Sequence, residues 1–511
     1  MPLLLEREAP ITLLDARKGM RFQYENDPHL SVREGWQSAT LEVLPQDGEG
    51  WLEAALGLDE TAYWLYDLGR DYACQGIVTV DRADGQEQVD ISYTEKFRSG
   101  ELVISDPKNY CRVRLTDRFS LRPGHQHLET FSLRGGRYIL IQVTGPTGDG
   151  FRFRPSVRVS EYPLEITKPL MIADEEMQAI VGLCETTFRA CLQDGFVDCT
   201  WRESSQWLGD ALPQALIMSS LCDDVRPLRQ VIEMAAQGVY PDGVLPSVSP
   251  GEVHAYTIVD YNFMWIELLQ LYWRLTGDVE FVQSVWPMLV KMLDRFHEDV
   301  DEQGLIISQP GRRLFLDWAP VSRSEPSAIY NLHYLFGLQV AAGMAGEHDE
   351  PRLAELWQAR AEMLSVSIRQ AFWEDGCWWD DLERTTYSQL SAALALLTGL
   401  TQSHEEYAQL DAIVARSLNP NDQPGQMVLA SPFMHHYLFE ALRMAGRDEG
   451  VVEIIKMRWG RWTRAGYPTT WENWNVDFPD GSQCHSFSAH PRHHLAEIAR
   501  SNGGSSLTRF C

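Results

Sequence analysis

The sequence contains no apolar run long enough to cross a membrane. Its longest purely apolar stretches are only a few residues, whereas a spanning helix needs about 20. The first residues, Met1 to Glu8, include no basic segment followed by a long apolar stretch and so predict no secretory signal. We therefore expect a protein without a membrane partner.

Positive charge is also scarce. The chain has 44 lysines and arginines against 72 aspartates and glutamates, which gives a formal net charge of −28 at pH 7. A chain this acidic repels the phosphates of nucleic acids and of anionic lipids. Neither partner is expected, whereas a neutral or cationic substrate meets no such repulsion.

Cysteine patterns that hold metals are absent. The nine cysteines include no C-x-x-C pair and no spacing typical of metal ligands. We predict free, mostly buried thiols in a reducing compartment, the cytoplasm. The adjacent pairs His435-His436 and His493-His494 are not expected to clamp a metal, because neighbouring residues on a helix point in different directions.

Nucleotide and serine-nucleophile signatures are missing as well. The chain has no G-x-G-x-x-G loop, no phosphate-loop lysine and no G-x-S-x-G motif. We therefore expect no cofactor and no metal.

The chain divides near residue 170 into two parts of different periodicity. Before this point, short alternating segments are separated by turn residues at 83–85 and 134–136. We predict an antiparallel β-sandwich over residues 1–170 and a second domain over residues 171–511. The clearest predicted strands are 76–80, 89–93, 111–115 and 138–143.

The second part follows helical periods, with several helices joined in pairs by short Gly/Asp links. Such hairpins favour an (α/α)6 toroid, in which inner helices bury their apolar faces and the loops at one end form a pocket. The predicted fold class is multidomain α and β, an N-terminal antiparallel β-sandwich followed by this toroid. Twelve helices are predicted, at 174–192, 208–221, 224–237, 257–276, 279–299, 326–345, 350–373, 387–398, 404–416, 430–445, 448–462 and 485–500.

One turn-rich segment concentrates acids, a cation and indoles. Carboxylates accept hydrogen bonds from vicinal sugar hydroxyls, and indole faces stack on the C–H face of a sugar. An arginine among them can neutralise one carboxylate and hold another in place. The segment therefore favours sugar binding, although acids at a helix start are also stabilised by the helix dipole alone. Its residues are Asp198, Trp201, Arg202, Glu203, Trp207 and Asp210.

A second segment places Glu472 between Trp471 and Trp474. Indoles desolvate a carboxyl group and are expected to raise its pKa, which suits a group that exchanges protons near neutral pH. The alternative is a surface glutamate between anchoring aromatics. Glycoside hydrolysis needs two carboxyl groups, one on each side of the scissile bond. Glu203 and Glu472 are the candidate pair.

Three further clusters are candidates for the same pocket. Asp260 begins a predicted helix, Asp317 and Trp318 end a loop, and His485 precedes the last helix. The two aspartates are plausible hydroxyl ligands and equally plausible helix caps. His485 is a candidate hydrogen-bond partner of substrate or of a carboxylate, with a structural role as the alternative.

In chain order these segments resemble glycoside hydrolase family 78, the bacterial-type α-L-rhamnosidases, which are six-hairpin glycosidases. The resemblance runs from about residue 60 to residue 500. The similar segments are 66–70 and 131–138 in the family's accessory β-sandwich, 198–210 in its acidic signature, 317–318 in its G-D-W motif, 471–474 in its W-E-R-W motif and 484–485 before its last helix.

The resemblance implies that Glu203 is the general acid and that Glu472 is the general base that activates water, with inversion at the anomeric carbon. It further implies a substrate-binding set that holds rhamnose: Asp198, Trp201, Arg202, Asp210, Asp260, Asp317, Trp318, Trp471 and His485. Residues 200–201, 204–206 and 473 depart from the family pattern. Because these positions line the sugar site or its rim, they leave the exact sugar open.

We predict an inverting glycoside hydrolase that releases terminal α-L-rhamnose from a short glycoside or oligosaccharide. Carbohydrate is its expected partner, and a homodimer is left open. Two alternatives stand beside this prediction. One is an inverting six-hairpin hydrolase for another sugar or an acidic oligosaccharide, and the other is a catalytically silent sugar-binding protein.

Overall fold

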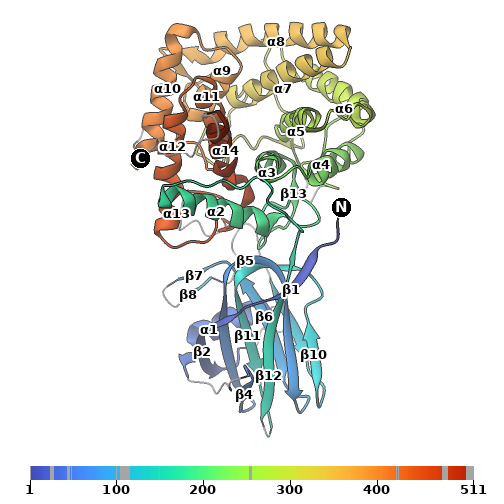
Figure 1. The fold of residues 1–511 in the computed structure, drawn as a ribbon, viewed down its shortest axis with the longest axis vertical. Helices are drawn as coiled ribbons and strands as arrows, with labels where there is room; N and C mark the ends of the chain where they lie inside the picture. Colours follow the sequence, from blue (N-terminus) through green and yellow to red (C-terminus); the bar gives the residue numbers. More distant parts are fainter. Residues whose placement is uncertain are drawn as a thin grey trace.

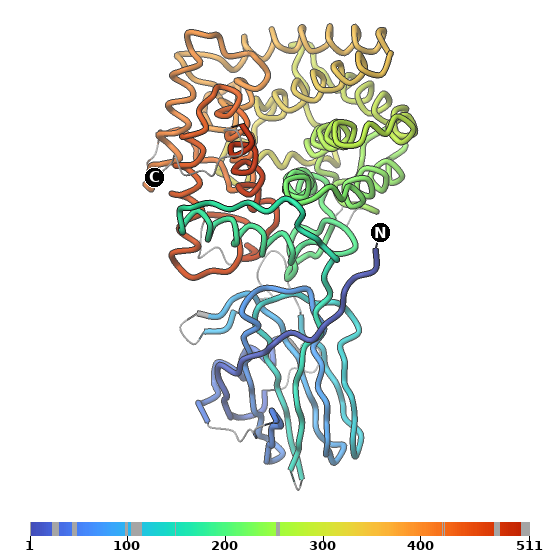
Figure 2. Tube along the Cα trace, viewed as in Figure 1, coloured from blue at the N-terminus to red at the C-terminus, as the bar shows by residue number. Residues whose placement is uncertain are grey.

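The structure is a computed structural model that describes residues 2–22, 28–42, 47, 49–98, 101–103, 115–148, 150–251, 256–421, 423, 425–474 and 481–501. Within them the chain forms a part made mainly of strands, drawn below, and a part made mainly of helices, drawn above (Figures 1 and 2). Cys111, Cys511 and all but the last residue of the predicted strand 111–115 lie outside the described residues.

The strands of the first part form one antiparallel sheet, ordered β1-β12-β5-β11-β6-β9, with β10 and β2 attached to β5, β3 to β2 and β4 to β12. A separate hairpin, Phe97–Arg98 with Glu101–Leu102, and helix α1, Pro28–Ser38, complete this part. The sheet strands are β1 Leu5–Ala9, β2 Thr12–Met20, β3 Thr40–Leu41, β4 Leu52–Ala54, β5 Glu60–Arg82, β6 Gln88–Thr94, β9 Thr116–Ser120, β10 Gln126–Glu129, β11 Arg134–Thr144 and β12 Phe151–Glu161.

The long strand β5 organises this sheet. Its first half pairs with β2 and β11, and its second half pairs with β10 and β12. Because the partners change along β5, the sheet curls around one apolar core that includes Trp64 and Phe153, whose rings meet edge to face at 5.0 Å. The predicted antiparallel strands are confirmed for the described residues, and they belong to one continuous sheet.

The predicted turn at 134–136 is wrong. These residues are the first three of β11, and the register of β11 against β5 shifts between Gly136 and Tyr138. Paired glycines signal bulges as well as turns. A Cβ on Gly135 would lie 1.8 Å from the carbonyl oxygen of Thr200. Glycine is therefore required here because the β11 backbone touches the helical part.

The twelve predicted helices are found, with differences in four of them. The predicted helix 257–276 begins at Tyr261, because Thr257–Ile258 is a short strand, and the predicted helix 430–445 begins at His435. The predicted helix 448–462 divides into α12 and α13, and the predicted helix 485–500 begins as a 3-10 turn, Ser486–Ala489, before Pro491 opens α14. The helices are α2 Glu175–Cys191, α3 Leu208–Leu221, α4 Arg226–Gln237, α5 Tyr261–Thr276, α6 Val279–Glu298, α7 Ala328–Glu347, α8 Pro351–Phe372, α9 Gln389–Leu397, α10 Ser403–Leu418, α11 His435–Met444, α12 Asp448–Arg458, α13 Gly460–Arg464 and α14 Pro491–Ser501.

Buried and half-exposed helices alternate along the second part. Helices α3, α5, α7, α9 and α11 are buried on most sides, whereas α4, α8 and α10 bury one face each. In α8 that face is Trp357, Ala361, Leu364, Ile368 and Phe372, at the three- and four-residue spacing of one helix side. In the hairpins α3–α4, α7–α8 and α9–α10, one helix is thus buried on most sides and its partner buries one face.

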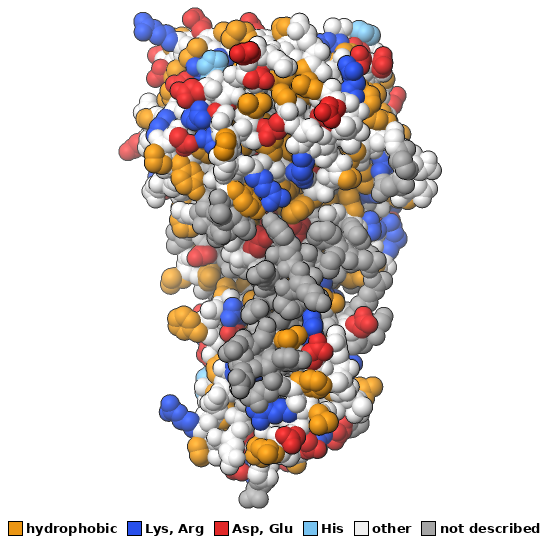
Figure 3. All heavy atoms as spheres, turned by 180° about the vertical axis from the view of Figure 1, so that it is seen from behind, with side chains coloured by type: hydrophobic (Ala, Val, Ile, Leu, Met, Phe, Trp, Pro, Cys, Tyr) orange, Lys and Arg blue, Asp and Glu red, His pale blue; other side chains and the backbone are white. Residues whose placement is uncertain are grey.

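Two surface properties follow from the described residues. No helix among them has both the length and the apolar composition to cross a lipid bilayer. Seen from behind, basic and acidic side chains are interspersed over the helical part, so the excess of acids is not gathered into a single patch on that face (Figure 3).

Candidate active site

A cavity of about 410 Å³ opens among the loops that lead into α3, α5, α7 and α14. Its wall contains both predicted catalytic acids and five of the other predicted site residues. These seven are Asp198, Arg202, Glu203, Asp210, Trp318, Glu472 and His485. The rest of the wall is Ser205, Trp207, Tyr256, Ile258, Tyr261, Arg313, Phe315 and Phe487.

The loop before α3 is braced by its own residues. The Asp198 carboxylate accepts a hydrogen bond from the backbone N–H of Ser205 at 2.8 Å, and the Asp198 N–H donates to the Ser205 carbonyl at 2.9 Å. Ser204, at φ +49°, turns the chain sharply between them. The Trp207 indole N–H then donates to Glu203 Oε2 at 2.6 Å. Glu203 is thereby held at the cavity wall.

The two predicted catalytic acids share one guanidinium group. Arg202 Nε lies 3.3 Å from Glu203 Oε1, and Arg202 Nη2 donates to Glu472 Oε1 at 2.8 Å. The side chain of Glu203 is 26% exposed, whereas that of Glu472 is 2% exposed. Two acids 269 positions apart in the chain therefore meet at one cavity in unequal environments.

Glu472 is stabilised as an anion. Its Oε2 accepts a hydrogen bond from the Ser482 N–H at 2.8 Å, and its own N–H donates to the Ser482 carbonyl at 2.9 Å. Burial by itself raises the pKa of Glu472, but the charges of Arg202 and His485 and these hydrogen bonds outweigh burial and hold the pKa below its ordinary value. At neutral pH this carboxylate is ionised.

The prediction that flanking indoles raise the pKa of Glu472 is wrong. Trp471 packs against Trp462 and Tyr467, at ring distances of 6.2 and 4.5 Å, and does not line the cavity. Trp474 stacks on Trp462 at 5.5 Å and donates its N–H to the backbone carbonyl of residue 430. Neighbours in sequence thus point into a different cluster, and the partners that set this pKa are distant in the chain.

A histidine connects two of the acids. His485 Nε2 lies 3.0 Å from Asp210 Oδ1, and its Nδ1 lies 3.8 Å from Glu472 Oε2. Burial alone lowers the pKa of His485, but the carboxylates of Glu472 and Asp210 raise it above the ordinary value. Burial raises the pKa of Asp210, which the hydrogen bond with His485 partly offsets. The cavity therefore offers both hydrogen-bond donors and acceptors to a polyhydroxylated ligand.

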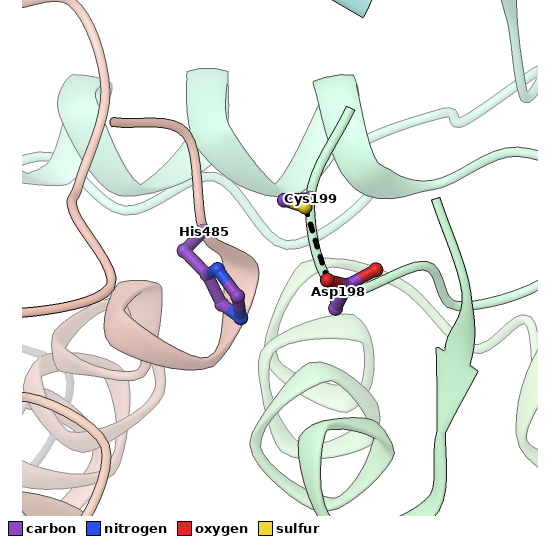
Figure 4. A group of neighbouring side chains, drawn as sticks. All are labelled: Asp198, Cys199 and His485. Atoms are coloured by element: carbon purple, nitrogen blue, oxygen red, sulfur yellow. Dashed lines mark hydrogen bonds between the residues drawn. The ribbon is translucent and has the colours of Figure 1, made fainter. Parts of the chain in front are cut away.

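Asp198 differs from Glu472 in its electrostatic surroundings. Burial and the nearby Glu203 carboxylate raise the pKa of Asp198 to about 8, and the Cys199 thiol donates to its Oδ2 at 3.0 Å. Figure 4 shows His485 facing this pair from the segment before α14. The three side chains are close enough to hold an ion. Burial raises the pKa of the Cys199 thiol well above its ordinary value, which favours the thiol form that donates to Asp198.

One histidine from each adjacent pair also comes together. His436 Nδ1 and His494 Nε2 lie 3.2 Å apart and hydrogen-bond to each other, with Glu440 Oε1 3.4 Å from His494 Nδ1. Glu440 in turn pairs with Arg443 at 3.2 Å. These ligand atoms already have partners within the cluster, and the neighbouring guanidinium disfavours a further cation.

Asp260 and Asp317 do not line the cavity. Asp260 accepts hydrogen bonds from the N–H groups of Phe315 and Leu316 at 3.0 and 2.7 Å, and Asp317 accepts one from Ser431 at 3.0 Å. Asp260 occupies the position before α5 but makes no side-chain cap there. The helix-cap alternative is therefore wrong for Asp260, and contact with a sugar hydroxyl stays a prediction that its place outside the cavity wall does not support. Its role is to hold the loop that presents Phe315 to the cavity.

Trp201 also lies away from the predicted sugar ring. Its indole N–H donates to the Tyr93 carbonyl at 3.2 Å, and Lys96 lies over its ring at 5.4 Å. Tyr93 and Lys96 belong to the β part of the molecule, so Trp201 forms a contact between the β part and the helical part. An indole is equally suited to a buried packing role and to sugar stacking, and the sequence does not separate the two.

Several wall residues were not predicted as site residues. Tyr256 and Arg313 belong to no motif that the sequence analysis recognised, and Phe315 stands two residues before the recognised pair 317–318. Tyr256 Oη accepts a hydrogen bond from Arg313 at 2.8 Å. The apolar half of the wall could have been predicted from two aromatic residues. Tyr261 directly follows Asp260 in the chain, and Phe487 stands two residues after His485.

Residues 170–498 match the model of the bacterial alpha-L-rhamnosidase six-hairpin glycosidase domain. Together with two acids at one cavity, this match places the chain among the glycoside hydrolases. It belongs to the bacterial α-L-rhamnosidase family defined by that domain. No curated protein sequence matches the chain significantly.

Solved structures share the fold. The glycoside hydrolase family 78 rhamnosidase of Bacillus sp. GL1 is 23% identical with a TM-score of 0.79, over 90% of this chain and 49% of that one. A Klebsiella oxytoca rhamnosidase with rhamnose bound is 18% identical with a TM-score of 0.76, over 97% of this chain and 96% of that one. The Streptomyces avermitilis α-L-rhamnosidase in complex with L-rhamnose is 16% identical with a TM-score of 0.65, over 97% and 44%. This chain thus spans about half of the Bacillus protein and nearly all of the Klebsiella protein.

Proposed function

We propose that the protein is an inverting α-L-rhamnosidase that releases terminal L-rhamnose from a short glycoside or oligosaccharide. The observation that carries the proposal is the pair Glu203 and Glu472, joined through Arg202 at one cavity. Family membership and structural relatives that bind rhamnose support the choice of sugar.

The unequal environments of the two acids support a division of roles between them. A general base must be ionised at the working pH, and the lowered pKa of Glu472 meets this requirement. Glu203 is the more exposed acid and stands beside Trp207, where it protonates the oxygen of the departing group. Water activated by Glu472 attacks the opposite face of the anomeric carbon, so the configuration inverts.

The remaining wall fits a deoxy sugar. Asp198, Asp210 and His485 bind hydroxyl groups through their buried oxygen and nitrogen atoms. The aromatic side of the cavity, which includes Tyr261 and Phe315, contacts the C–H face and the methyl group of rhamnose.

The proposed function is accompanied by a proposal about the fold. We propose that the hairpins close into an (α/α)6 toroid over residues 171–511, with residues 1–170 as an accessory β-sandwich. The alternation of buried and one-sided helices supports it. A cytoplasmic location is supported by the described cysteines, all of which are free.

A panel of 4-nitrophenyl glycosides tests the substrate, and ¹H NMR of the first product formed tests the stereochemistry. Hydrolysis of the α-L-rhamnoside above all others, with β-L-rhamnose appearing first, is the expected result. Preference for a different sugar, or for an acidic oligosaccharide, would favour the alternative hydrolase. Binding of rhamnose without turnover on any glycoside would favour a silent sugar-binding protein.

A further inference from the structure

Glu95 is a buried acid that reaches from the β part into the helical part. It follows β6 directly and is 3% exposed. Its Oε1 accepts a hydrogen bond from Ser482 Oγ at 3.0 Å, and its Oε2 accepts one from the Gln483 N–H at 2.6 Å. Residues almost 390 positions apart are thus tied together by two hydrogen bonds to one carboxylate.

Ser482, held by Glu95, holds Glu472 in turn. The Ser482 N–H donates to Glu472 Oε2 at 2.8 Å, and its carbonyl accepts the Glu472 N–H at 2.9 Å. A single residue therefore separates the acid of the β part from the proposed general base. Displacement of Ser482 removes a hydrogen bond from the ionised form of Glu472.

The same end of β6 also touches the loop of the proposed general acid. The Tyr93 carbonyl accepts the Trp201 indole N–H, and Lys96 lies over that indole. Beside them, the close approach of Gly135 to Thr200 leaves no room for a side chain. The segment from 93 to 96 thus contacts both loops that carry the catalytic pair.

We propose that Glu95 is a positioning residue: by holding Ser482 it sets the place and the proton affinity of Glu472, which makes the β part a working component of the active site. This inference rests on the proposed function for its kinetic readout. Glu95 does not line the cavity among the described residues, so it acts through the residues it holds, above all Ser482.

Several charged and titratable groups surround the two acids. Burial raises the pKa of Glu95 to about 7, while the Gln483 N–H and the charge of Lys96 oppose it. The groups around Glu95 are Asp71, Lys96, Cys191, Cys199, Cys484 and His485. The groups around Glu472 are Arg202, Asp210, Tyr261 and His485.

The test is the substitution Glu95→Gln, read out in the pH profile of kcat/KM. Glutamine offers one acceptor oxygen in place of two, so the contacts to the Ser482 hydroxyl and the Gln483 N–H cannot both persist. A weaker hold on Ser482 weakens its hydrogen bond to the Glu472 carboxylate, so the pKa of Glu472 rises and the acid limb of the profile moves to higher pH. We expect kcat/KM at its optimum to fall roughly tenfold, the size of one charged hydrogen bond. A merely structural residue changes the amount of folded enzyme and leaves the acid limb in place.

Asp90→Asn is the matched control. Asp90 is another buried acid of the β part, and it accepts two hydrogen bonds from Arg118 at 2.8 Å, away from Glu95 and Ser482. We expect this variant to lose thermal stability while the acid limb stays where it is in the wild type. Equal shifts in both variants would overturn the proposal, as would an unshifted limb in Glu95→Gln.

A second variant and a substrate-free measurement keep the inference separate from the proposed function. If Glu95→Gln does not fold, Ser482→Ala removes the hydroxyl that bonds to Glu95 and to the Cys484 backbone but keeps the Ser482 N–H that bonds to Glu472. It is expected to shift the limb in the same direction. Carboxyl ¹³C NMR of labelled glutamate, with Glu472→Gln to assign the signal, reports the pKa of Glu472 without any substrate. An unchanged Glu472 titration in the Glu95 or Ser482 variant overturns the inference even if the enzyme proves to cleave another sugar.

Discussion

The two loops that carry the catalytic pair are built in opposite ways. Glu203 itself is held mainly by near neighbours within residues 198–207, while Thr200 and Trp201 of the same loop touch the β part. The loop with Glu472 is held by Ser482, Arg202 and, through Ser482, by Glu95 of the β part. A self-braced loop tolerates change elsewhere, whereas a loop braced from a distance depends on several parts of the molecule at once. The acid and the base should therefore respond differently to the same kind of substitution.

The largest effect is expected from Glu472→Gln. An amide cannot take a proton from water, so kcat should fall about a thousandfold. The loss should be similar for 4-nitrophenyl and alkyl rhamnosides, because activation of water does not depend on the departing group. Steady-state kinetics on both substrates measures it, and a loss of less than tenfold would remove Glu472 from the role of base.

Glu203→Gln should cost about a hundredfold on an alkyl rhamnoside, whose leaving oxygen needs a proton. The loss on the 4-nitrophenyl rhamnoside should be smaller, because nitrophenolate departs with little help. The loss on the alkyl rhamnoside divided by the loss on the 4-nitrophenyl rhamnoside should be large for Glu203→Gln and close to one for Glu472→Gln. Identical ratios in the two variants would contradict the division of roles.

Arg202→Gln should affect both acids, with a loss of roughly tenfold at pH 7. Arg202 lowers the pKa of Glu472, so Glu472 is ionised above that lowered value and loses its charge as the pH falls through it. Without the guanidinium this pKa rises, and the acid limb of kcat/KM moves to higher pH. The control is Arg313→Gln at the same cavity, since Arg313 bonds to Tyr256; its acid limb should not move.

The smallest effect on activity is expected from Gly135→Ala. This substitution tests the contact between the β part and the helical part through the stability of the fold. The new methyl group would meet the Thr200 backbone at 1.8 Å, so we expect a loss of about 1–3 kcal/mol in unfolding free energy. Gly182→Ala is the control, because nothing lies within 4 Å of its Cβ position in α2 and alanine favours a helix. Chemical denaturation measures both, and equal stabilities would show that the contact is dispensable.

The sequence predicts those features that are local or periodic. The helices follow from spacing, and the acids at 198–210 follow from their concentration in one turn-rich segment. The sequence does not reveal which way a side chain points. Trp201 and Trp471 have the residue type of a sugar platform but make contacts with the β part and in the core. The lowered pKa of Glu472 depends on Arg202 and His485, which no local pattern connects to it.

The long strand β5 also bears on how the chain folds. Its pairing with β2 and with β12 joins residues about 50 and about 80 positions apart, whereas most helical hairpins close between neighbours. Contacts between distant segments form slowly because long loops must close first. The curled sheet should therefore be the late and rate-limiting unit of folding, and a newly made chain should acquire its helical content before its β part is complete.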